Sequence, residues 1–189
     1  MSALSIVGRY QDKITWNSIH GGSKRVELRP WRFNQVQDSG IHMIVARLAG
    51  LSDQSAPVFG EPVYDKRIGR MALGSGNVAW DSLPDPSTAE KDVTAVSLIN
   101  ETHSISIAPD DLSWLDTNGA PIATPSNRFG GTITIGVDVV GDLREFGLFG
   151  AYNNANSMMF NWVSHPLIQK DNSSTIERSV DITITIVRS

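Results

Sequence analysis

The residues that could perform acid–base chemistry are two glutamates. Glu145 lies beside Arg144 in an otherwise apolar run, and Glu177 lies near the end of the sequence. Two carboxyl groups flanking a sugar could hydrolyse a glycosidic bond, but nothing in this spacing indicates that the two meet. An acid within an apolar run is more often ion-paired and structural than catalytic. We therefore favour an ion-paired structural role for Glu145 and expect no enzyme activity, with a hydrolase using Glu145 or Glu177 as the weaker alternative.

Nucleophilic and metal-assisted chemistry have little support in the other residues. Cysteine is absent, which excludes disulfides, thiolate catalysis and cysteine-ligated zinc. The histidines are His20, His42, His103 and His165, and no two have the four-residue spacing of a metal-binding helix. No serine lies in the Gly-x-Ser-x-Gly pattern of a nucleophile elbow. We expect neither a metal nor a cofactor.

A glycine-rich segment at residues 74–76 is the place where a backbone could cradle phosphate. Gly74-Ser75-Gly76 follows a predicted strand, where glycines can bring backbone N–H groups close to an anion. No Lys-Ser or Lys-Thr follows and no amphipathic helix begins there, so neither the P-loop nor the dinucleotide-binding pattern is met. We interpret the segment as a structural turn, because glycine is the default residue at positive φ.

The tryptophans could bind carbohydrate, because their rings offer sugars an apolar platform. Five tryptophans also suit the core of a β-sandwich, so the two interpretations differ only in which rings are exposed. Binding to a glycan receptor therefore stays open as the alternative function. The residues concerned are Trp16, Trp31, Trp80, Trp114 and Trp162.

Charge and hydropathy exclude several classes of partner. The formal net charge is −4, whereas a nucleic-acid surface needs a basic patch. Basic residues cluster at residues 24–32, and we interpret that cluster as a solvated strand or loop. No segment approaches the roughly 18 apolar residues of a membrane span, and residues 1–5 lack the features of a secretion signal. We expect no nucleic acid, no membrane insertion and synthesis in the cytoplasm.

Strands are the elements that must position these residues. Residues 181–187 and 132–139 alternate apolar and polar side chains, which is typical of half-buried strands. Shorter strands are predicted at residues 13–16, 26–28 and 104–107. The apolar run at residues 144–150 lies between the two long strands in sequence, so we place it in the same sheet system.

One segment has helical periodicity. Asp38 or Ser39 could cap a helix, and apolar residues then recur at spacings of three and four up to Leu51. We therefore predict a mainly β fold, an antiparallel β-sandwich-like domain with one main α-helix at about residues 39–50, with an α+β domain as the alternative. At 189 residues the chain fits a single domain, in which residues 1–30 could be an N-terminal extension of unknown role.

Several short motifs follow one another along the chain. Residues 31–34 (Trp-Arg-Phe-Asn) are followed by Asp-Ser-Gly at 38–40 and the predicted helix. Residues 71–76 (Met-Ala-Leu-Gly-Ser-Gly), an Asp-Pro loop and residues 98–101 (Leu-Ile-Asn-Glu) come next. The run at 145–150 and a later His-Pro and lysine complete the series. The order of these motifs resembles phage tail-fibre and tail-collar type proteins. The chain departs from the family in residues 1–30 and in lacking the arginine that often follows the Asn-Glu element.

This resemblance implies a structural subunit of a tail fibre, collar or baseplate. Such a subunit is a homo-oligomer that contacts other tail or baseplate proteins, serves host attachment and resides in a virion tail or a phage-tail-like contractile injection particle. The resemblance implies packing rather than catalytic roles for the motif residues. These are Asn34, Gly40, Gly74, Gly76, Asn100, Glu101, Glu145, Phe146, Gly147, Leu148, Phe149, His165, Pro166 and Lys170.

Overall fold

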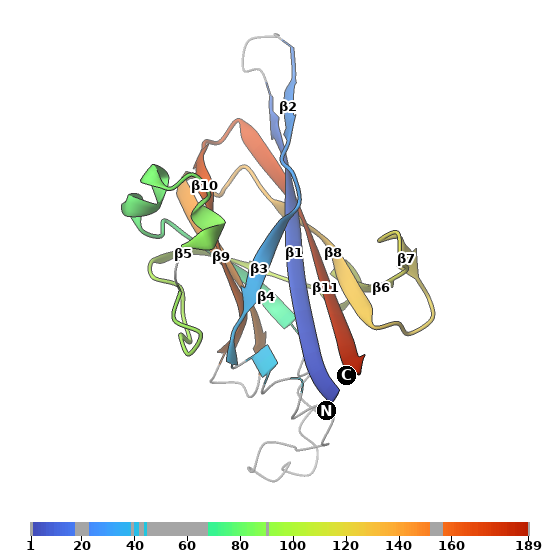
Figure 1. Cartoon of the computed structure of the whole chain (residues 1–189). Helices are drawn as coiled ribbons and strands as arrows, with labels where there is room; N and C mark the ends of the chain where they lie inside the picture. Colours follow the sequence, from blue (N-terminus) through green and yellow to red (C-terminus); the bar gives the residue numbers. More distant parts are fainter. Residues whose placement is uncertain are drawn as a thin grey trace, which may run out of the picture.

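The chain folds into one antiparallel sheet of 11 strands (Figure 1). This computed structural model describes residues 2–17, 23–38, 40–41, 44, 68–89, 91–151 and 157–188. The strands are β1 (Ser2–Trp16), β2 (Arg25–Leu28), β3 (Arg32–Val36), β4 (Ile68–Gly74), β5 (Glu101–Ser106), β6 (Ser113–Leu115), β7 (Pro121–Ile122), β8 (Arg128–Ile135), β9 (Gly141–Ala151), β10 (Ser157–Lys170) and β11 (Ser174–Arg188). Three short 3-10 turns connect them: η1 (Val78–Ser82), η2 (Pro86–Thr88) and η3 (Pro109–Asp111).

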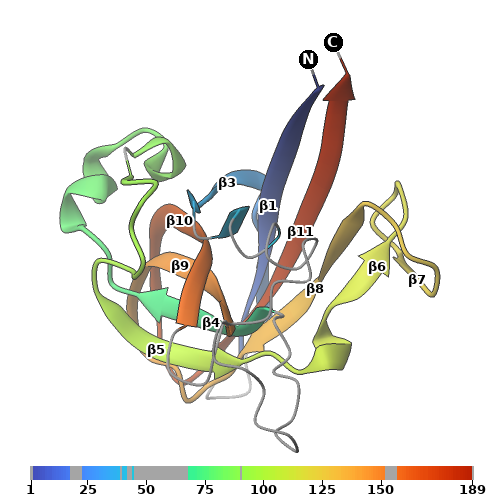
Figure 2. The ribbon, with the colours of Figure 1, turned by 90° about the horizontal axis from the view of Figure 1, so that it is seen from below.

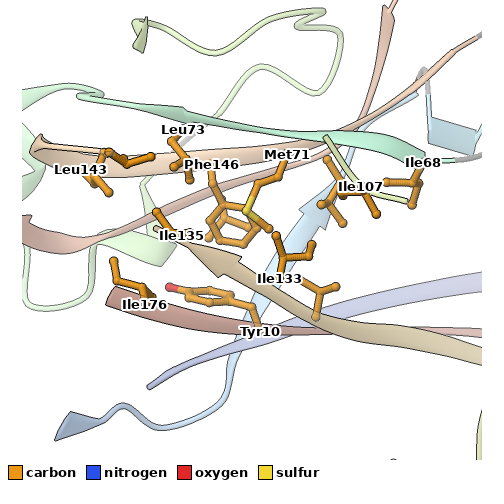
Figure 3. Packing of buried hydrophobic residues seen from close by; sticks show 14 of the residues in the cluster. Tyr10, Ile68, Met71, Leu73, Ile107, Ile133, Ile135, Leu143, Phe146 and Ile176 are labelled. Atoms are coloured by element: carbon orange, nitrogen blue, oxygen red, sulfur yellow. The ribbon is translucent and has the colours of Figure 1, made fainter. Parts of the chain in front are cut away.

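The sheet folds back on itself around one core. Its strand order is β5-β4-β9-β10-β3-β1-β11-β8-β6-β7, with β2 paired to β1. The half that contains β4, β9 and β10 therefore faces the half that contains β1, β11 and β8, and β3 pairs with both. Figure 3 shows Met71 and Phe146 from the first half facing Ile133 and Tyr10 from the second. The Tyr10 and Phe146 rings meet edge to face at 5.0 Å between centroids.

The pairing of β1 with β11 carries three pairs of opposite charges. Arg9 lies opposite Asp181, Asp12 opposite Arg178, and Lys13 opposite Glu177. All three pairs are ion pairs with N–O distances of 2.6–2.7 Å. Asp12 and Arg178 point into the core, whereas the other two pairs lie on the outer face of the sheet. A slip of one residue would reverse these faces, so charge and burial together fix this register.

One end of the β1–β11 pair extends beyond its neighbours (Figure 2). β3 pairs with β1 only at residues 8–10, and β8 pairs with β11 only up to Thr183. Within the described part of the chain, residues 2–7 therefore pair only with residues 183–188. We call these two segments the β1–β11 ribbon.

The mainly β fold is confirmed, and the predicted strands at 181–187 and 104–107 lie within or largely within β11 and β5. The strand predicted at 132–139 was too long, because β8 ends at Ile135 and Val137 is exposed in the turn that follows. The one main helix predicted at about residues 39–50 is not established, because most of that segment lies outside the described residues. Only Asp38, Gly40, Ile41 and Ile44 can be placed, all with helical backbone. Residues 1–30 contain β1, which supplies Tyr10 and Ile14 to the core.

Candidate functional site

Three of the motif residues, Gly74, Asn100 and Glu145, meet where the end of β4 and the loop before β5 lie against β9. Glu145 is fully buried, and its carboxylate accepts hydrogen bonds from the backbone N–H of Asn100 at 2.9 Å and the Trp162 indole at 2.8 Å. A Cβ atom at Gly74 would lie 2.5 Å from both Glu145 Oε1 and the Asn100 carbonyl oxygen. Gly76 has a φ of +56°, which glycine adopts without strain. Glycine and glutamate are therefore required here to bring the loop before β5 onto β9.

The sequence predicts that Glu145 is ion-paired, but in the structure its carboxylate accepts hydrogen bonds from uncharged N–H groups. Arg144 points to the other side of β9, where it donates three hydrogen bonds to the Asp81 carboxylate at 2.8–3.1 Å. Among the described residues, Glu145 is paired with N–H donors and not with a cation. Alternate residues of a strand face opposite sides, so sequence neighbours such as Arg144 and Glu145 cannot pair within it.

A second group of motif residues lies in the core around Arg178. Its guanidinium bonds Asp12 at 2.7 and 2.8 Å and lies 4.0 Å from the centre of the Phe146 ring. His165 is 3.5 Å from the same guanidinium, and its Nδ1 lies 2.9 Å from the Pro166 carbonyl oxygen. Burial opposes ionisation of Asp12, but Arg178 overrides this and holds the pKa of that carboxyl below its usual value. The cluster joins β1, β9, β10 and β11.

His165 is neutral in this environment. Complete burial, reinforced by the charge of Arg178, lowers the pKa of the imidazole to about 3. A neutral ring packed among Tyr10, Phe146 and Arg178 is a core side chain.

The other motif residues have separate packing roles in the sheet. Lys170 is buried at the turn between β10 and β11, where Nζ donates to the Ser174 carbonyl at 2.7 Å. Asn34 packs against Gly8 of β1, and Gly40 packs against the Phe160 backbone. Glu101 pairs with Arg70 at 2.7 Å. In the run at 146–149, Phe146 and Leu148 belong to the main core. Phe149 belongs to a smaller cluster with Trp80 and Trp162. Gly147 packs against the Asn161 carbonyl oxygen.

The tryptophans divide into buried and exposed rings. Trp80 and Trp162 are buried, whereas Trp31 and Trp114 are 41% and 42% exposed. Trp16 is partly buried, with the Arg25 guanidinium 4.5 Å from its ring centre. Two rings are therefore available for stacking on a ligand.

The basic residues of the 24–32 cluster are largely paired with acids. Arg25 and Arg29 contact Glu27, and Arg32 contacts Asp85. Within the described ranges, no three histidine or acidic side chains gather where a metal could bind. None of the helical segments that the structure describes has the length and apolarity to cross a membrane.

Comparisons with protein-family models, with curated proteins and with solved structures found no match to this chain.

The residues that sequence reasoning missed are the paired charges of β1 and β11. Their signal is a mirrored order of charge: positive, negative, positive at Arg9, Asp12 and Lys13, and negative, positive, negative at Glu177, Arg178 and Asp181. The spacings of three and one are reversed between the two segments, as antiparallel pairing requires. A search for mirrored charges along the whole sequence could have found this pair.

Glu145→Ala is expected to destabilise the fold strongly. The change leaves the Asn100 N–H and the Trp162 indole without an acceptor, which should lower the free energy of unfolding by about 3 kcal/mol. Glu101→Ala is the control, because this partly exposed ion pair should contribute less than about 1 kcal/mol. Urea unfolding followed by tryptophan fluorescence measures both, and equal losses would contradict the role assigned to Glu145.

His165 is expected to make stability depend on pH. Its pKa is lower in the folded chain than in the unfolded chain, so the unfolded state takes up the proton first as the pH falls. The stabilisation is complete above the ordinary histidine pKa of about 6.5, and about 2 kcal/mol of it should be lost between pH 8 and pH 5. Urea unfolding at these two pH values should show that loss in the wild type and in His103→Gln. A similar loss in His165→Gln would show that another group is responsible.

Proposed function

We propose that the chain is a non-catalytic structural subunit that acts by assembling with other protein chains. The observation that carries this proposal is the β1–β11 ribbon. An isolated two-stranded ribbon is at best marginally stable in water, and its unpaired backbone groups attract further strands. Among the described residues, the outer edge of residues 2–7 has no strand partner. On the other edge β8 stops pairing with β11 at Thr183, and Asn127 bonds the backbone of Ile184. A neighbouring chain that adds a strand there would satisfy those groups.

The composition of the ribbon fits this proposal. Edge strands of monomeric proteins are usually protected by charges or proline. The ribbon, residues 2–7 and 183–188, contains no proline and one charged residue, Arg188 at its tip, and most of its other residues are Ser, Thr, Val, Ile or Leu. Val7 is 43% exposed, and Thr185 is also exposed. The segment is thus suited to pairing with a second strand and unsuited to lasting contact with water.

The resemblance to tail-fibre and tail-collar type proteins suggests the particle in which the subunit would assemble. A phage tail or a phage-tail-like contractile injection particle presents each subunit to many identical neighbours, which suits an uncharged strand edge. The order of the motifs from Trp31 to Lys170 supports this part of the proposal. Genes for tail-tube, sheath or baseplate proteins beside this one would strengthen it, and a neighbourhood without any of them would count against it.

Glycan binding is the second candidate function. The exposure of Trp31 favours it, because an exposed indole ring is costly unless it contacts a partner, and sugars stack on such rings. This role is compatible with assembly, since a fibre subunit can also bind a receptor.

Ser5→Lys is expected to weaken assembly. The residue lies in the ribbon, and a lysine on an edge strand opposes strand addition by bringing like charges together in the assembly. Size-exclusion chromatography with light scattering at micromolar concentration should give a mass several times 20.6 kDa for the wild type and a clearly smaller mass for the variant.

Gln11→Lys is the matched control. It lies in the same strand and on the same face as Ser5, but within the body of the sheet, and it should leave the mass of the assembly unchanged. A wild-type protein of 20.6 kDa at every concentration would refute assembly as the function of the isolated chain. An equal decrease for both lysine variants would refute the role of the ribbon.

A further inference from the structure

A cavity of about 390 Å³ lies on the outer face of the sheet beside Trp31. Its floor comes from β1, β8 and β11, and its wall from η3 and the β6–β7 segment, which projects beyond β8 (Figure 2). A volume of this size is within the range of small-ligand sites. We call it the outer cavity.

Trp31 is held in the rim of the outer cavity by a guanidinium. Arg9 lies 4.7 Å from the centre of the indole ring, which is 41% exposed. The contact orders the ring although the side chain is outside the core. A ring ordered before binding loses little conformational freedom when a ligand stacks on it.

The floor of the cavity contains a buried carboxylate between two arginines. Asp181 is 2% exposed and accepts hydrogen bonds from Arg9 Nε at 2.7 Å and Arg128 Nε at 2.8 Å. Arg128 also donates to the Asp116 and Thr117 carbonyls, which ties the cavity wall to the floor. These arginines hold the pKa of Asp181 below its usual value, although burial opposes this. Asp181 is therefore a fixed charge that orients Arg9.

Arg9 retains hydrogen-bonding capacity toward the cavity. Among the described residues Asp181 is its only hydrogen-bond acceptor, and the bond uses Nε, so both terminal amino groups remain available. The Arg9 side chain is 39% exposed. Hydroxyl groups of Thr132 and Ser179, which bond each other at 3.0 Å, lie in the same lining.

Two glycines allow close backbone packing at this floor. A Cβ atom at Gly130 would lie 2.0 Å from the Val180 carbonyl oxygen, and one at Gly131 would lie 1.8 Å from the Asp111 carbonyl oxygen. The second contact shows that η3 approaches β8 as closely as a backbone can. The cavity wall is thus built tightly onto the sheet.

We propose that the outer cavity binds a neutral pyranose sugar of a glycan. The apolar face of a pyranose stacks on the indole ring, and its hydroxyl groups accept from Arg9 and donate to carboxylates. Asp110 and Asp111 line the cavity and would repel an anion, whereas Arg9 and Arg128 would repel a cation. A ligand whose groups both donate and accept without net charge suits this mixture.

The neighbouring surface has room for a longer chain. Trp31 and Phe33 also line an adjacent open cavity of about 640 Å³, together with Asp85 and Lys91. Phe33 is 72% exposed. Because Trp31 lines both cavities, its ring lies where two successive sugars of an oligosaccharide would meet.

This site rests on the second candidate function and is independent of assembly. The test is a glycan array followed by titration calorimetry with the best neutral oligosaccharide, using the wild type, Trp31→Ala and Trp114→Ala. Trp114 is the matched control, because it has the same residue type and nearly the same exposure but does not line either cavity. Trp31→Ala should weaken binding about tenfold or more, and Trp114→Ala should leave it unchanged.

Arg9→Lys supplies a second variant, which keeps the charge but loses the planar fork and the stacking on Trp31. It should also weaken binding at least severalfold, with far-UV circular dichroism as the check on folding. Wild-type protein that binds no glycan would overturn both the site and glycan binding. If Trp31→Ala and Arg9→Lys both bind the glycan as tightly as the wild type, the outer cavity is not the binding site, although glycan binding stands. If only acidic glycans bind, the proposal that the ligand is neutral is wrong. Light scattering measures assembly independently of glycan binding, so a negative binding result does not bear on the proposal that the chain assembles.

Discussion

The first and last strands of the described chain pair over 15 residues each, and the positions of the core, the outer cavity and the ribbon all follow from the register of that pair. Opposite charges face each other at three points along it, one pair inside and two outside. The inner pair, Asp12 and Arg178, is fully buried and touches Phe146 across the core. Burying two charges is costly, so an arrangement that separated them would be strongly disfavoured.

The same register has consequences on both faces of the sheet. Inside, it brings Arg178 between the two halves, where His165 and Phe146 pack against it. Outside, it places Arg9 over Asp181, which orients the guanidinium that holds Trp31. Beyond Gly8 the two strands continue together with Arg188 as the one charged residue, and the β1–β11 ribbon results. The features proposed for assembly and for glycan binding are therefore parts of one strand pair.

Local patterns in the sequence predicted the strands more reliably than their partners. The alternation at 181–187 correctly predicted the last part of β11, because the alternation of apolar and polar side chains depends only on residues that are neighbours in the sequence. The convergence of Gly74, Asn100 and Glu145 could not be derived from spacing, since it depends on which strands lie side by side. The prediction that the strand continues through Val137 was wrong for a related reason. The apolar side chain of Val137 continues the alternation in the sequence, although the strand has already ended and the backbone turns after Gly136. The exposure of Trp31 likewise depends on how the segment before β3 packs on the sheet.

The most direct test of this account is a double-mutant cycle on Asp12 and Arg178, measured as the free energy of unfolding in urea. Asp12→Leu and Arg178→Met should each lower it by about 3–5 kcal/mol, because each leaves a buried charge without its partner. The account predicts that the double variant loses much less than the sum, with a coupling of at least about 2 kcal/mol. Losses that add to within about 0.5 kcal/mol would contradict the claim that this pair fixes the register of β1 and β11.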